Sequence, residues 1–364
     1  MATMQDAGGD LLARIADGVA HVTLNRPAAL NALSFDMLAG LAGWLDEWEN
    51  DDAVRAVVLR GAGEKAFCAG GDIRALYDGA KSGTQHNGRY FEVEYALDFR
   101  IHRYPKPCVA LMDGIVMGGG MGIAQGAAVR IVGDRTRMAM PETGIGLFPD
   151  VGGSWFLTRR PGEAGTWLGL CGAPIKAADC IESGLADLYL PPAGIASLDT
   201  VIAEAAGRAD PRAAIREALA SRAEMPPGGQ LRSLGPAIDL HFGKPTVAAI
   251  LDSLGAESRE AYADWAKATL ERLGKCSPTM LCVALEQLRR GRGMALADCF
   301  RMELGMVNTC FEQGDFLEGI RALIVDKDNQ PHWSPARLAD VKPEAVEAFF
   351  RDRWPAGAHP LAAL

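Results

Sequence analysis

Two nearly all-apolar segments, each followed by a glycine-rich stretch, constrain the fold of this chain more than any other feature. The segments are VRAVVLRG (54–61) and PCVALMDG (107–114), and their composition is typical of strands buried on both faces of a sheet. Each ends at a glycine and continues through further glycines into a helical pattern, as EKAFCAGGDIRAL and as IVMGGGMGIAQGA. This order of strand, loop and helix predicts an α/β fold, in the broad sense that includes α+β, with two glycine-rich helix N-termini on one side of a sheet.

The flanking segments extend this pattern. Residues 11–25 predict a β-hairpin that turns at Asp17–Gly18, because the segments before and after the turn alternate in polarity. A helix over 36–49 follows, with Ser34 as its expected N-cap. A third strand is expected within 127–133. The N-terminal half of the chain therefore predicts a sheet with helices packed against it.

Strand signals stop near residue 209, and the rest of the chain predicts helices. Segment 261–273 places its apolar side chains on one helical face. Segment 277–291 starts with an N-capping serine and a proline at the first helical position, and it closes with a glycine. We therefore predict two units, a core over 1–208 and a mainly helical C-terminal region over 209–364 that packs on the core.

Composition excludes several classes of function. The formal net charge is −9 and the pI is near 5.3, which argues against nucleic acid as a partner. No segment approaches the apolar length of a membrane span, and the first ten residues show no secretory signal. The eight cysteines form no C-x-x-C pair and no zinc-ligand spacing, which predicts reduced thiols in a cytoplasmic protein without a metal site.

The two glycine-rich stretches are candidate ligand sites. FCAGGD contains Gly70 and Gly71, and MGGGMG contains Gly118, Gly119 and Gly120. The stretch MGGGMG does not fit the dinucleotide pattern G-x-G-x-x-G in any register, so a nicotinamide cofactor is disfavoured. Glycines let a ligand approach the backbone closely, and each stretch can direct a backbone N–H toward it. Two such donors are what a developing oxyanion needs.

The stretch PETGIGLFPDVGG (141–153) places Glu142 and Asp150 among apolar neighbours such as Ile145 and Phe148. Two close carboxylates in apolar surroundings should have pKa values that are pushed apart, as suits an acid/base pair. Structural explanations are also open. Glu142 could be an acidic residue in the first turn of a helix, and Asp150 could cap a helix that begins near Gly152.

Taken together and in order, the motifs KAFCAGGD, DGIVMGGGMG, MPETGIGLFPDVGG and DFLEGIRALIVDKDNQPHW resemble the crotonase (enoyl-CoA hydratase/isomerase) superfamily. The resemblance covers residues 11–335. It implies a spiral core of ββα repeats, here with an additional C-terminal helical region, and assembly as a trimer or a multiple of trimers. It also implies an acyl-CoA thioester as the ligand, with its carbonyl oxygen between the backbone N–H groups of Gly71 and Gly119, and no cofactor besides the coenzyme A of the substrate.

Within the superfamily, one position separates hydratases from this chain. Hydratases use two glutamates, of which one matches Glu142, while the other falls where this chain has Gly122. Asp150, the DKD-x-x-P-x-W motif and the extra helical length resemble the 3-hydroxyisobutyryl-CoA hydrolases, which are thioesterases of valine breakdown. In that branch a third acidic residue contacts the substrate, and it matches Glu94. An enoyl-CoA hydratase or isomerase is the alternative, and a catalytically idle acyl-CoA-binding protein is a second one.

The resemblance also suggests roles for individual side chains. Glu142 would act either as the nucleophile or as the base that activates water, and Asp150 would orient the water or the substrate hydroxyl or share the proton. Arg26, Lys65 and Arg74 are the local positive charges that could contact the phosphates of coenzyme A, although each could equally be a solvated surface charge.

Overall fold

The computed structural model describes residues 3–83, 86–355 and 357–364. The chain forms two compact units, each built from segments that are far apart in the sequence. The first unit contains Met1–Asp72, Ala96–Met138 and Pro174–Gly229, and the second contains Ile73–Tyr95, Ala139–Ala173 and Gln230–Leu364.

This division differs from the predicted boundary between residues 208 and 209. The regular elements of the described chain after that point are indeed helical. However, two earlier segments, 73–95 and 139–173, belong to the same compact unit as most of these helices. The reason is packing, because helices formed by these segments lie against C-terminal helices and bury their apolar faces there.

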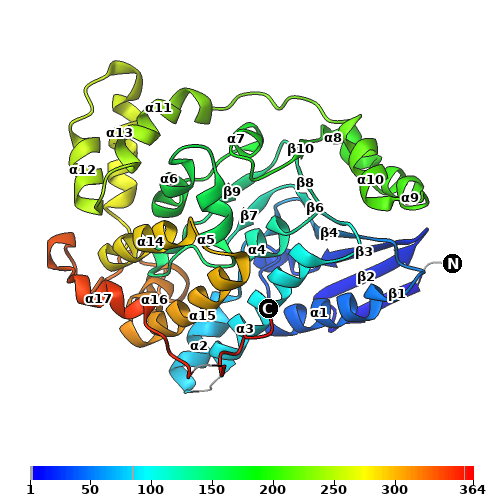
Figure 1. Ribbon diagram of the computed structural model, residues 1–364, viewed down its shortest axis with the longest axis horizontal. Helices are drawn as coiled ribbons and strands as arrows, with labels where there is room; N and C mark the ends of the chain where they lie inside the picture. Colours follow the sequence, from blue (N-terminus) through cyan, green and yellow to red (C-terminus); the bar gives the residue numbers. More distant parts are fainter. Residues whose placement is uncertain (1–2, 84–85, 356) are drawn as a thin grey trace. The chain divides into compact units, whose positions relative to one another are not determined.

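The larger sheet belongs to the first unit and has the strand order β1-β2-β3-β4-β6-β8-β10 within the described residues. Its strands are β1 (Thr3–Ala7), β2 (Leu11–Ala16), β3 (Val19–Leu24), β4 (Ala56–Gly61), β6 (Cys108–Met112), β8 (Val129–Val132) and β10 (Leu188–Tyr189). The first three strands pair antiparallel and the others join in parallel, as Figure 1 shows. Both buried strands predicted from the sequence, and the third one, are therefore confirmed.

The predicted hairpin is also confirmed. Strands β2 and β3 pair from Leu11 opposite Leu24 to Ala16 opposite Val19. The turn residues Asp17 and Gly18 both have positive φ, 52° and 80°. Positive φ at both central residues is the two-residue turn that suits the right-handed twist of hairpin strands, and aspartate followed by glycine adopts it readily.

A smaller sheet contains β5 (Ala66–Cys68), β7 (Ile115–Met117) and β9 (Arg137–Ala139) in that order. Strands β5 and β7 are parallel, and each lies directly before one of the two glycine-rich loops. The smaller sheet therefore holds both loops at neighbouring strand ends, which is the arrangement that the repeated strand, loop and helix pattern predicted.

Helices complete the two units. The first unit contains α1 (Phe35–Glu49), α4 (Gly119–Gln125), α7 (Ala177–Glu182), α8 (Pro192–Ala196), α9 (Leu198–Ala206), α10 (Pro211–Ala220) and the short η1 (Pro27–Ala29). The second unit contains α2 (Ile73–Ser82), α5 (Gly153–Phe156), α6 (Ala164–Cys171), α11 (Leu231–Phe242), α12 (Val247–Gly255), α13 (Glu260–Leu273), α14 (Pro278–Gly291), α15 (Leu296–Gln313), α16 (Asp315–Ile320), α17 (Pro343–Glu347) and the short η2 (Glu142–Ile145), η3 (Leu157–Arg159), η4 (Arg321–Val325), η5 (Leu338–Asp340) and η6 (Ala348–Phe350). The boundary between the units divides α3 (His86–Arg103).

Two predicted helix starts are confirmed with their caps. The Ser34 side chain accepts a hydrogen bond from the Met37 amide at the start of α1. The Ser277 side chain does the same for the Met280 amide at the start of α14, where Pro278 occupies the first helical position. Gly291 closes α14 in a crowded place, because a Cβ atom there would lie 2.2 Å from the Ser154 carbonyl oxygen. This close approach lets α14 pack tightly against α5.

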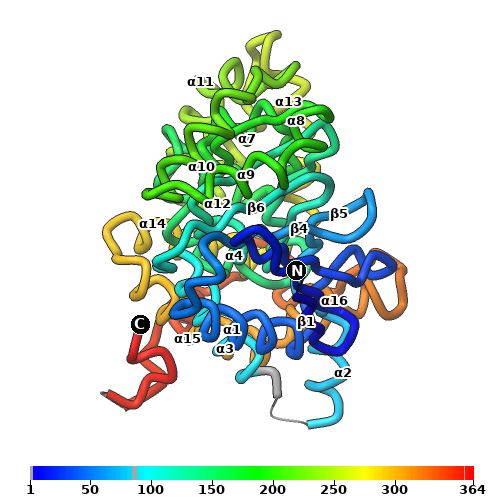
Figure 2. Tube along the Cα trace, turned by 90° about the vertical axis from the view of Figure 1, so that its right-hand side faces the viewer, coloured from blue at the N-terminus to red at the C-terminus, as the bar shows by residue number. Residues whose placement is uncertain are grey.

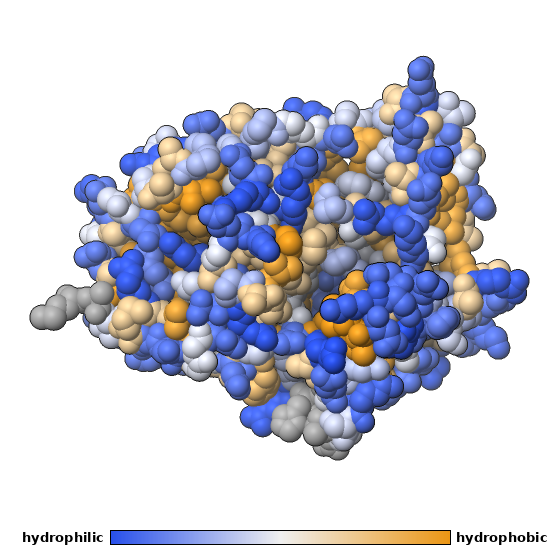
Figure 3. All heavy atoms as spheres, turned by 180° about the vertical axis from the view of Figure 1, so that it is seen from behind, coloured by the Kyte–Doolittle hydropathy of each residue, from blue (hydrophilic) through white to orange (hydrophobic). Residues whose placement is uncertain are grey.

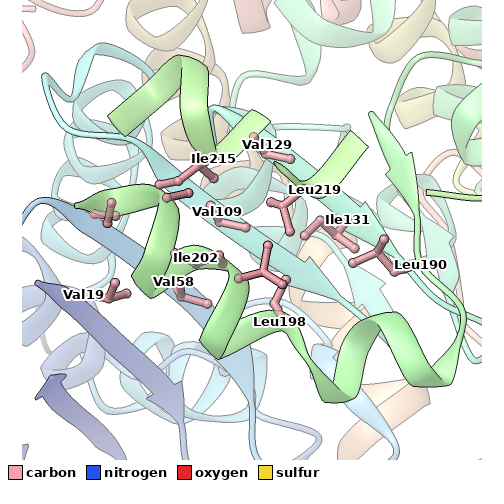
Figure 4. Close-up of a cluster of buried hydrophobic side chains, with 14 residues drawn as sticks. Val19, Val58, Val109, Val129, Ile131, Leu190, Leu198, Ile202, Ile215 and Leu219 are labelled. Atoms are coloured by element: carbon pink, nitrogen blue, oxygen red, sulfur yellow. The ribbon is translucent and has the colours of Figure 1, made fainter. Parts of the chain in front are cut away.

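The sheet of the first unit is covered on one face by α9 and α10, which lie side by side in Figures 1 and 2. Figure 4 shows apolar side chains from alternate strand positions meeting those of the two helices. Because side chains alternate between the faces of a sheet, Val58 points into this cluster, and the side chains next to it on β4 point to the opposite face. Burial of this cluster holds α9 and α10 against strands β3, β4, β6 and β8 of the larger sheet.

Polar side chains gather on the surface of the chain. Hydrophilic residues prevail on the face drawn in Figure 3, with small hydrophobic patches between them. None of the helices formed by the described residues combines the length and the apolar character that a membrane span requires.

Candidate active site

The first glycine-rich loop lies in the first unit and directs one amide outward. The Leu33 amide donates to the Gly70 carbonyl over 2.8 Å, and the Asp72 amide donates to the Leu33 carbonyl over 2.9 Å. These two bonds form a parallel bridge between Leu33 and Gly71. In such a bridge the middle residue turns its own N–H away from its partner. The Gly71 amide therefore points away from Leu33 and is available as a donor.

The second loop, also in the first unit, leads into α4. Gly118 precedes the helix with φ 49°, a backbone conformation that favours glycine, and Gly119 is the first helical residue. Its N–H is one of the helix-terminal donors that have no partner inside the helix. A Cβ atom on Gly70 would lie 3.5 Å from the Gly119 nitrogen, and one on Gly120 would lie 2.4 Å from the Cys68 carbonyl oxygen. The two loops therefore touch. Their approach requires glycine at position 120, whereas Gly70 has φ 109°, a backbone conformation that favours glycine.

A cluster of buried carboxylates forms the chemical centre of the second unit. Glu94 lies on α3, Glu142 is the first residue of η2, and Asp150 lies in the loop before α5. Their exposed fractions are 2%, 4% and 4%. Acidic side chains are rarely so buried unless they are paired or functional. The three predicted acidic residues are thus brought together inside one unit.

Asp150 is held by a tyrosine. The Tyr95 hydroxyl donates a hydrogen bond to Asp150 Oδ2 over 2.7 Å, and both residues are buried. The capping explanation for Asp150 is wrong, because the N-cap of α5 is Gly152 and the side chain of Asp150 bonds to Tyr95 instead. The structural explanation for Glu142 was a place in the first turn of a helix, and Glu142 does lie in the first turn of the short helix η2.

Two carboxylate oxygens of this cluster are buried and make no hydrogen bond within the described part of the chain. Among the described residues, neither Glu94 Oε1 nor Glu142 Oε2 has a hydrogen-bond partner, although both atoms are buried. Buried polar atoms are nearly always hydrogen-bonded in folded proteins, and exceptions often mark a site for a ligand or water. The two oxygens are therefore suited to meet a polar group of a bound substrate.

Burial dominates the electrostatics of the cluster. It raises the pKa of Glu94 and of Glu142 well above the usual range, and the nearby charge of Asp150 raises both further. Burial raises the pKa of Asp150 to about 7, although the hydrogen bond from Tyr95 acts in the opposite direction. At neutral pH the cluster therefore holds at least one proton that it can donate, as proton transfer in catalysis requires.

Sequence reasoning missed the groups that surround Asp150. Tyr95 directly follows Glu94, and its role depends on a contact with Asp150 that the sequence does not reveal. Glu303 on α15 and Gln287 on α14 hydrogen-bond the loop from Pro149 to Ser154. The only available signal for Glu303 was a single carboxylate in the apolar stretch ELGMV.

The predicted phosphate contacts differ in their surroundings. The guanidinium group of Arg26 pairs with Asp72 at 2.9 Å and with Asp10 at 3.3 Å, which makes it a poor candidate for a free phosphate contact. Lys65 is exposed beside the first glycine loop. Arg74 is exposed on α2 and pairs with Asp78 at 3.2 Å. Of the three, Lys65 therefore stays the best candidate for a contact with the phosphates of coenzyme A. Arg26 instead holds the loop that carries Gly71, through its ion pair with Asp72.

Gly122 and the cysteines were the other features that the sequence singled out. Gly122 is buried inside α4 and offers no acid or base at that position. All eight cysteines are free thiols. Over the described parts of the chain, no group of three or more His, Cys, Asp and Glu side chains could hold a metal ion.

Comparisons with known proteins show what the whole chain is similar to. Residues 19–350 match the family model described as Enoyl-CoA hydratase/isomerase. The chicken (Gallus gallus) protein named 3-hydroxyisobutyryl-CoA hydrolase, mitochondrial is 37% identical over 349 residues, which are 95% of this chain and 90% of the relative. The Arabidopsis thaliana 3-hydroxyisobutyryl-CoA hydrolase 1 is 37% identical over 356 residues, or 96% and 93% of the two chains. A crystal structure of a carnitinyl-CoA dehydratase from Mycobacterium thermoresistibile has a TM-score of 0.87 and 41% identity, covering 96% of this chain and 98% of that chain.

Proposed function

Because this chain belongs to the enoyl-CoA hydratase/isomerase (crotonase) family, we propose that it is an acyl-CoA thioester hydrolase whose substrate is 3-hydroxyisobutyryl-CoA. Relatives that carry the hydrolase name match nearly the whole chain. The observation that carries the proposal is the buried cluster of Glu94, Glu142 and Asp150, combined with the glycine at position 122. A hydratase of the usual kind needs a second glutamate where Gly122 stands, whereas a hydrolase can use Asp150.

The glycine loops would stabilise the oxyanion. In this proposal the amides of Gly71 and Gly119 donate to the thioester carbonyl oxygen, and the bonds strengthen as negative charge develops on it. The outward direction of the Gly71 amide and the helix-terminal position of Gly119 support this role. Gly70, Gly118 and Gly120 serve it indirectly, because they allow the two loops to approach each other.

The carboxylates would carry out the proton transfers. If Glu142 acts as the base, it removes a proton from water, and the water oxygen adds to the carbonyl carbon. The tetrahedral oxyanion then collapses, the C–S bond breaks, and the thiolate of coenzyme A takes up the proton. If Glu142 is the nucleophile, its oxygen displaces the thiolate to form a mixed anhydride, and water hydrolyses the anhydride in a second step. Asp150 orients the attacking water in either route and shares the proton with Glu142.

Glu94 would select the substrate. Its unpartnered, buried Oε1 can accept a hydrogen bond from the hydroxyl group of 3-hydroxyisobutyryl-CoA. A substrate that lacks this hydroxyl would leave the oxygen without a partner, and this difference gives discrimination. The proposal places the reaction in valine breakdown, as the resemblance to the hydrolases implies, and needs no cofactor beyond coenzyme A in the substrate.

The proposal is tested by two assays of the purified chain. Release of free thiol from 3-hydroxyisobutyryl-CoA is expected, together with little or no hydration of crotonyl-CoA. Rapid hydration of crotonyl-CoA without thiol release would support the alternative, an enoyl-CoA hydratase or isomerase. The carnitinyl-CoA dehydratase name of one structural relative makes this comparison necessary. Binding of both compounds without turnover would instead indicate an idle acyl-CoA-binding protein.

Replacing Tyr95 by phenylalanine is expected to lower kcat about tenfold, because the hydrogen bond that orients Asp150 is lost. That bond also lowers the pKa of Asp150, so its loss raises this pKa further. If the reaction requires ionised Asp150, the acidic limb of the kcat–pH profile moves to higher pH. Thiol-release kinetics over a range of pH check this result, and an unchanged profile would exclude Tyr95 as an orienting group.

Location and assembly stay predictions. We propose a cytoplasmic location because the cysteine spacing favours reduced thiols, although relatives such as the chicken hydrolase carry the word mitochondrial in their names. We also propose the homo-oligomeric assembly, a trimer or a multiple of trimers, that the family resemblance implies.

A further inference from the structure

One buried carboxylate outside the proposed catalytic group, that of Glu303, is hydrogen-bonded to two backbone amides and to the Ser154 side chain. Glu303 on α15 has an exposed fraction of 0%. Its Oε2 accepts the Gly152 amide over 2.7 Å, and its Oε1 accepts the Ser154 amide over 2.9 Å. Burying a carboxylate is costly, so a side chain kept in this place has a structural or functional reason. Burial raises the pKa of Glu303 to about 8, which reflects this cost.

The backbone that Glu303 holds is strained. Val151 has φ 51° and Gly152 has φ 86°. The left-handed region is open to glycine but unfavourable for a β-branched residue such as valine. A strained residue persists only where its surroundings enforce it, and such residues gather at functional sites. Val151 directly follows Asp150, so the strain lies immediately beside a proposed catalytic side chain.

A second buried side chain holds the same loop from α14. Gln287 Nε2 donates to the Pro149 carbonyl over 2.6 Å and to Ser154 Oγ over 2.8 Å. Glu303 and Gln287 therefore bond to residues on both sides of Asp150. Since Tyr95 bonds to the side chain of Asp150 itself, both the backbone and the carboxylate of this residue are fixed.

We propose that Glu303 is a positioning residue for the hydrolase reaction. Its carboxylate accepts hydrogen bonds from the Gly152 and Ser154 amides, and these bonds keep the strained turn at Val151 in the conformation that holds Asp150 in its reactive orientation. The inference rests on the proposed function, since it assigns to Glu303 a role in the same reaction. Misplacing a reacting group by about 1 Å can cost roughly 100-fold in rate. A turn that is released from Glu303 can relax by such a distance.

A graded pair of substitutions tests the proposal. Glu303→Gln keeps one acceptor oxygen, whereas Glu303→Met keeps none while retaining a similar length. We expect kcat for thiol release to fall about tenfold in Glu303→Gln and about 100-fold in Glu303→Met, with KM changed less than about threefold. The fall belongs in kcat because Glu303 makes its contacts with the loop of Asp150 and not with the substrate.

Glu257 provides a matched control. It is a carboxylate of the same unit with a side chain only 3% exposed, and it accepts the Arg259 amide over 2.8 Å just before α13. Glu257→Gln and Glu257→Met should change the melting temperature but leave kcat unaltered. All rates are measured well below the melting temperature of each variant. If both Glu303 variants keep the parental kcat while only their melting temperatures fall, Glu303 is merely a structural cap and the proposal is wrong.

A readout without turnover separates this inference from the proposed activity. The distance from Tyr95 Oη to Asp150 Oδ2 is 2.7 Å in the parent chain. A crystal structure of Glu303→Gln or Glu303→Met should show this contact lengthened beyond hydrogen-bond distance and the turn at Val151 relaxed. An unchanged loop in both variants would overturn the positioning role. Absence of thiol release in the parent chain would instead refute the proposed function, whatever the loop does.

Discussion

Replacing Glu142 by glutamine is expected to lower kcat for hydrolysis of 3-hydroxyisobutyryl-CoA about 1,000-fold or more. Glutamine has nearly the same shape but can neither accept the proton of water nor form an anhydride readily. The buried Glu142 Oε2, which has no hydrogen-bond partner among the described residues, is the atom that performs this step in our proposal. Release of free thiol under saturating substrate measures the effect.

The Glu257→Gln variant serves as the matched control, because it makes the same chemical change at a buried carboxylate elsewhere in the unit. Its kcat should equal that of the parent. Were Glu142→Gln to retain more than about a tenth of the parental kcat, Glu142 would be neither base nor nucleophile, since such groups contribute at least about 100-fold.

A trapping experiment separates the two roles of Glu142. The nucleophilic route passes through a mixed anhydride on the Glu142 side chain, and hydroxylamine converts such an anhydride into a stable hydroxamate. Mass spectrometry of the peptide containing Glu142, taken during turnover, should show this mass change if Glu142 is the nucleophile. An unmodified peptide with undiminished turnover would favour the base.

Replacing Asp150 by asparagine is expected to lower the activity of the protein and to raise its stability, both by a large amount. The kcat for thiol release should fall about 100-fold, because asparagine cannot share a proton with Glu142. The free energy of unfolding should rise at alkaline pH, because a buried ionisable group is removed. Loss of function together with gain of stability is the behaviour expected where an active site is held in a costly arrangement.

The sign of the stability change follows from the pKa. Burial raises the pKa of Asp150 from 3.8 to about 7 in the folded chain. A raised carboxyl pKa stabilises the folded state at low pH, and this contribution is lost as the pH rises from the unfolded value through about 7. Asparagine has no charge to bury at any pH. The gain in Asp150→Asn should therefore be small near about pH 4 and reach the order of 4 kcal/mol near about pH 8.

Denaturant unfolding of the parent and of Asp150→Asn at both pH values measures this difference. Asparagine retains an oxygen that can accept the Tyr95 hydrogen bond, so the loop should keep its conformation. A variant that is equally destabilised at both pH values would show that Asp150 holds the loop and that its ionisation carries no cost. A variant with normal kcat would remove Asp150 from the mechanism.

Much of the local structure could be predicted from the sequence, because it depends on neighbouring residues. The hairpin at Asp17–Gly18 follows from a turn that requires two positive φ values, and the helix starts at Ser34 and Ser277 follow from side chains that cap amides three residues away. The two glycine loops were found for the same reason. Glycine runs after buried strands mark places where the backbone must turn and approach another segment closely.

The division into units could not be predicted in this way. Segments 73–95 and 139–173 precede the helical half of the chain but share a compact unit with it. Their own periodicity shows only that they have apolar faces and does not show which partner covers those faces. Burial of apolar surface is non-directional, so the partner is decided by the shapes of all the elements together.

The sequence by itself determined the hairpin, three buried strands, two capped helices, the glycine loops and the identity of Glu142 and Asp150 as candidate acidic residues, because each of these depends on a few adjacent residues. Only the tertiary structure decided which groups act on Asp150. Tyr95 is 55 residues away from Asp150, and Glu303 is 151 residues away from the Gly152 amide that it accepts. Contacts over such distances arise from packing of the whole unit, and this packing also supplies the burial that raises the pKa values of the cluster.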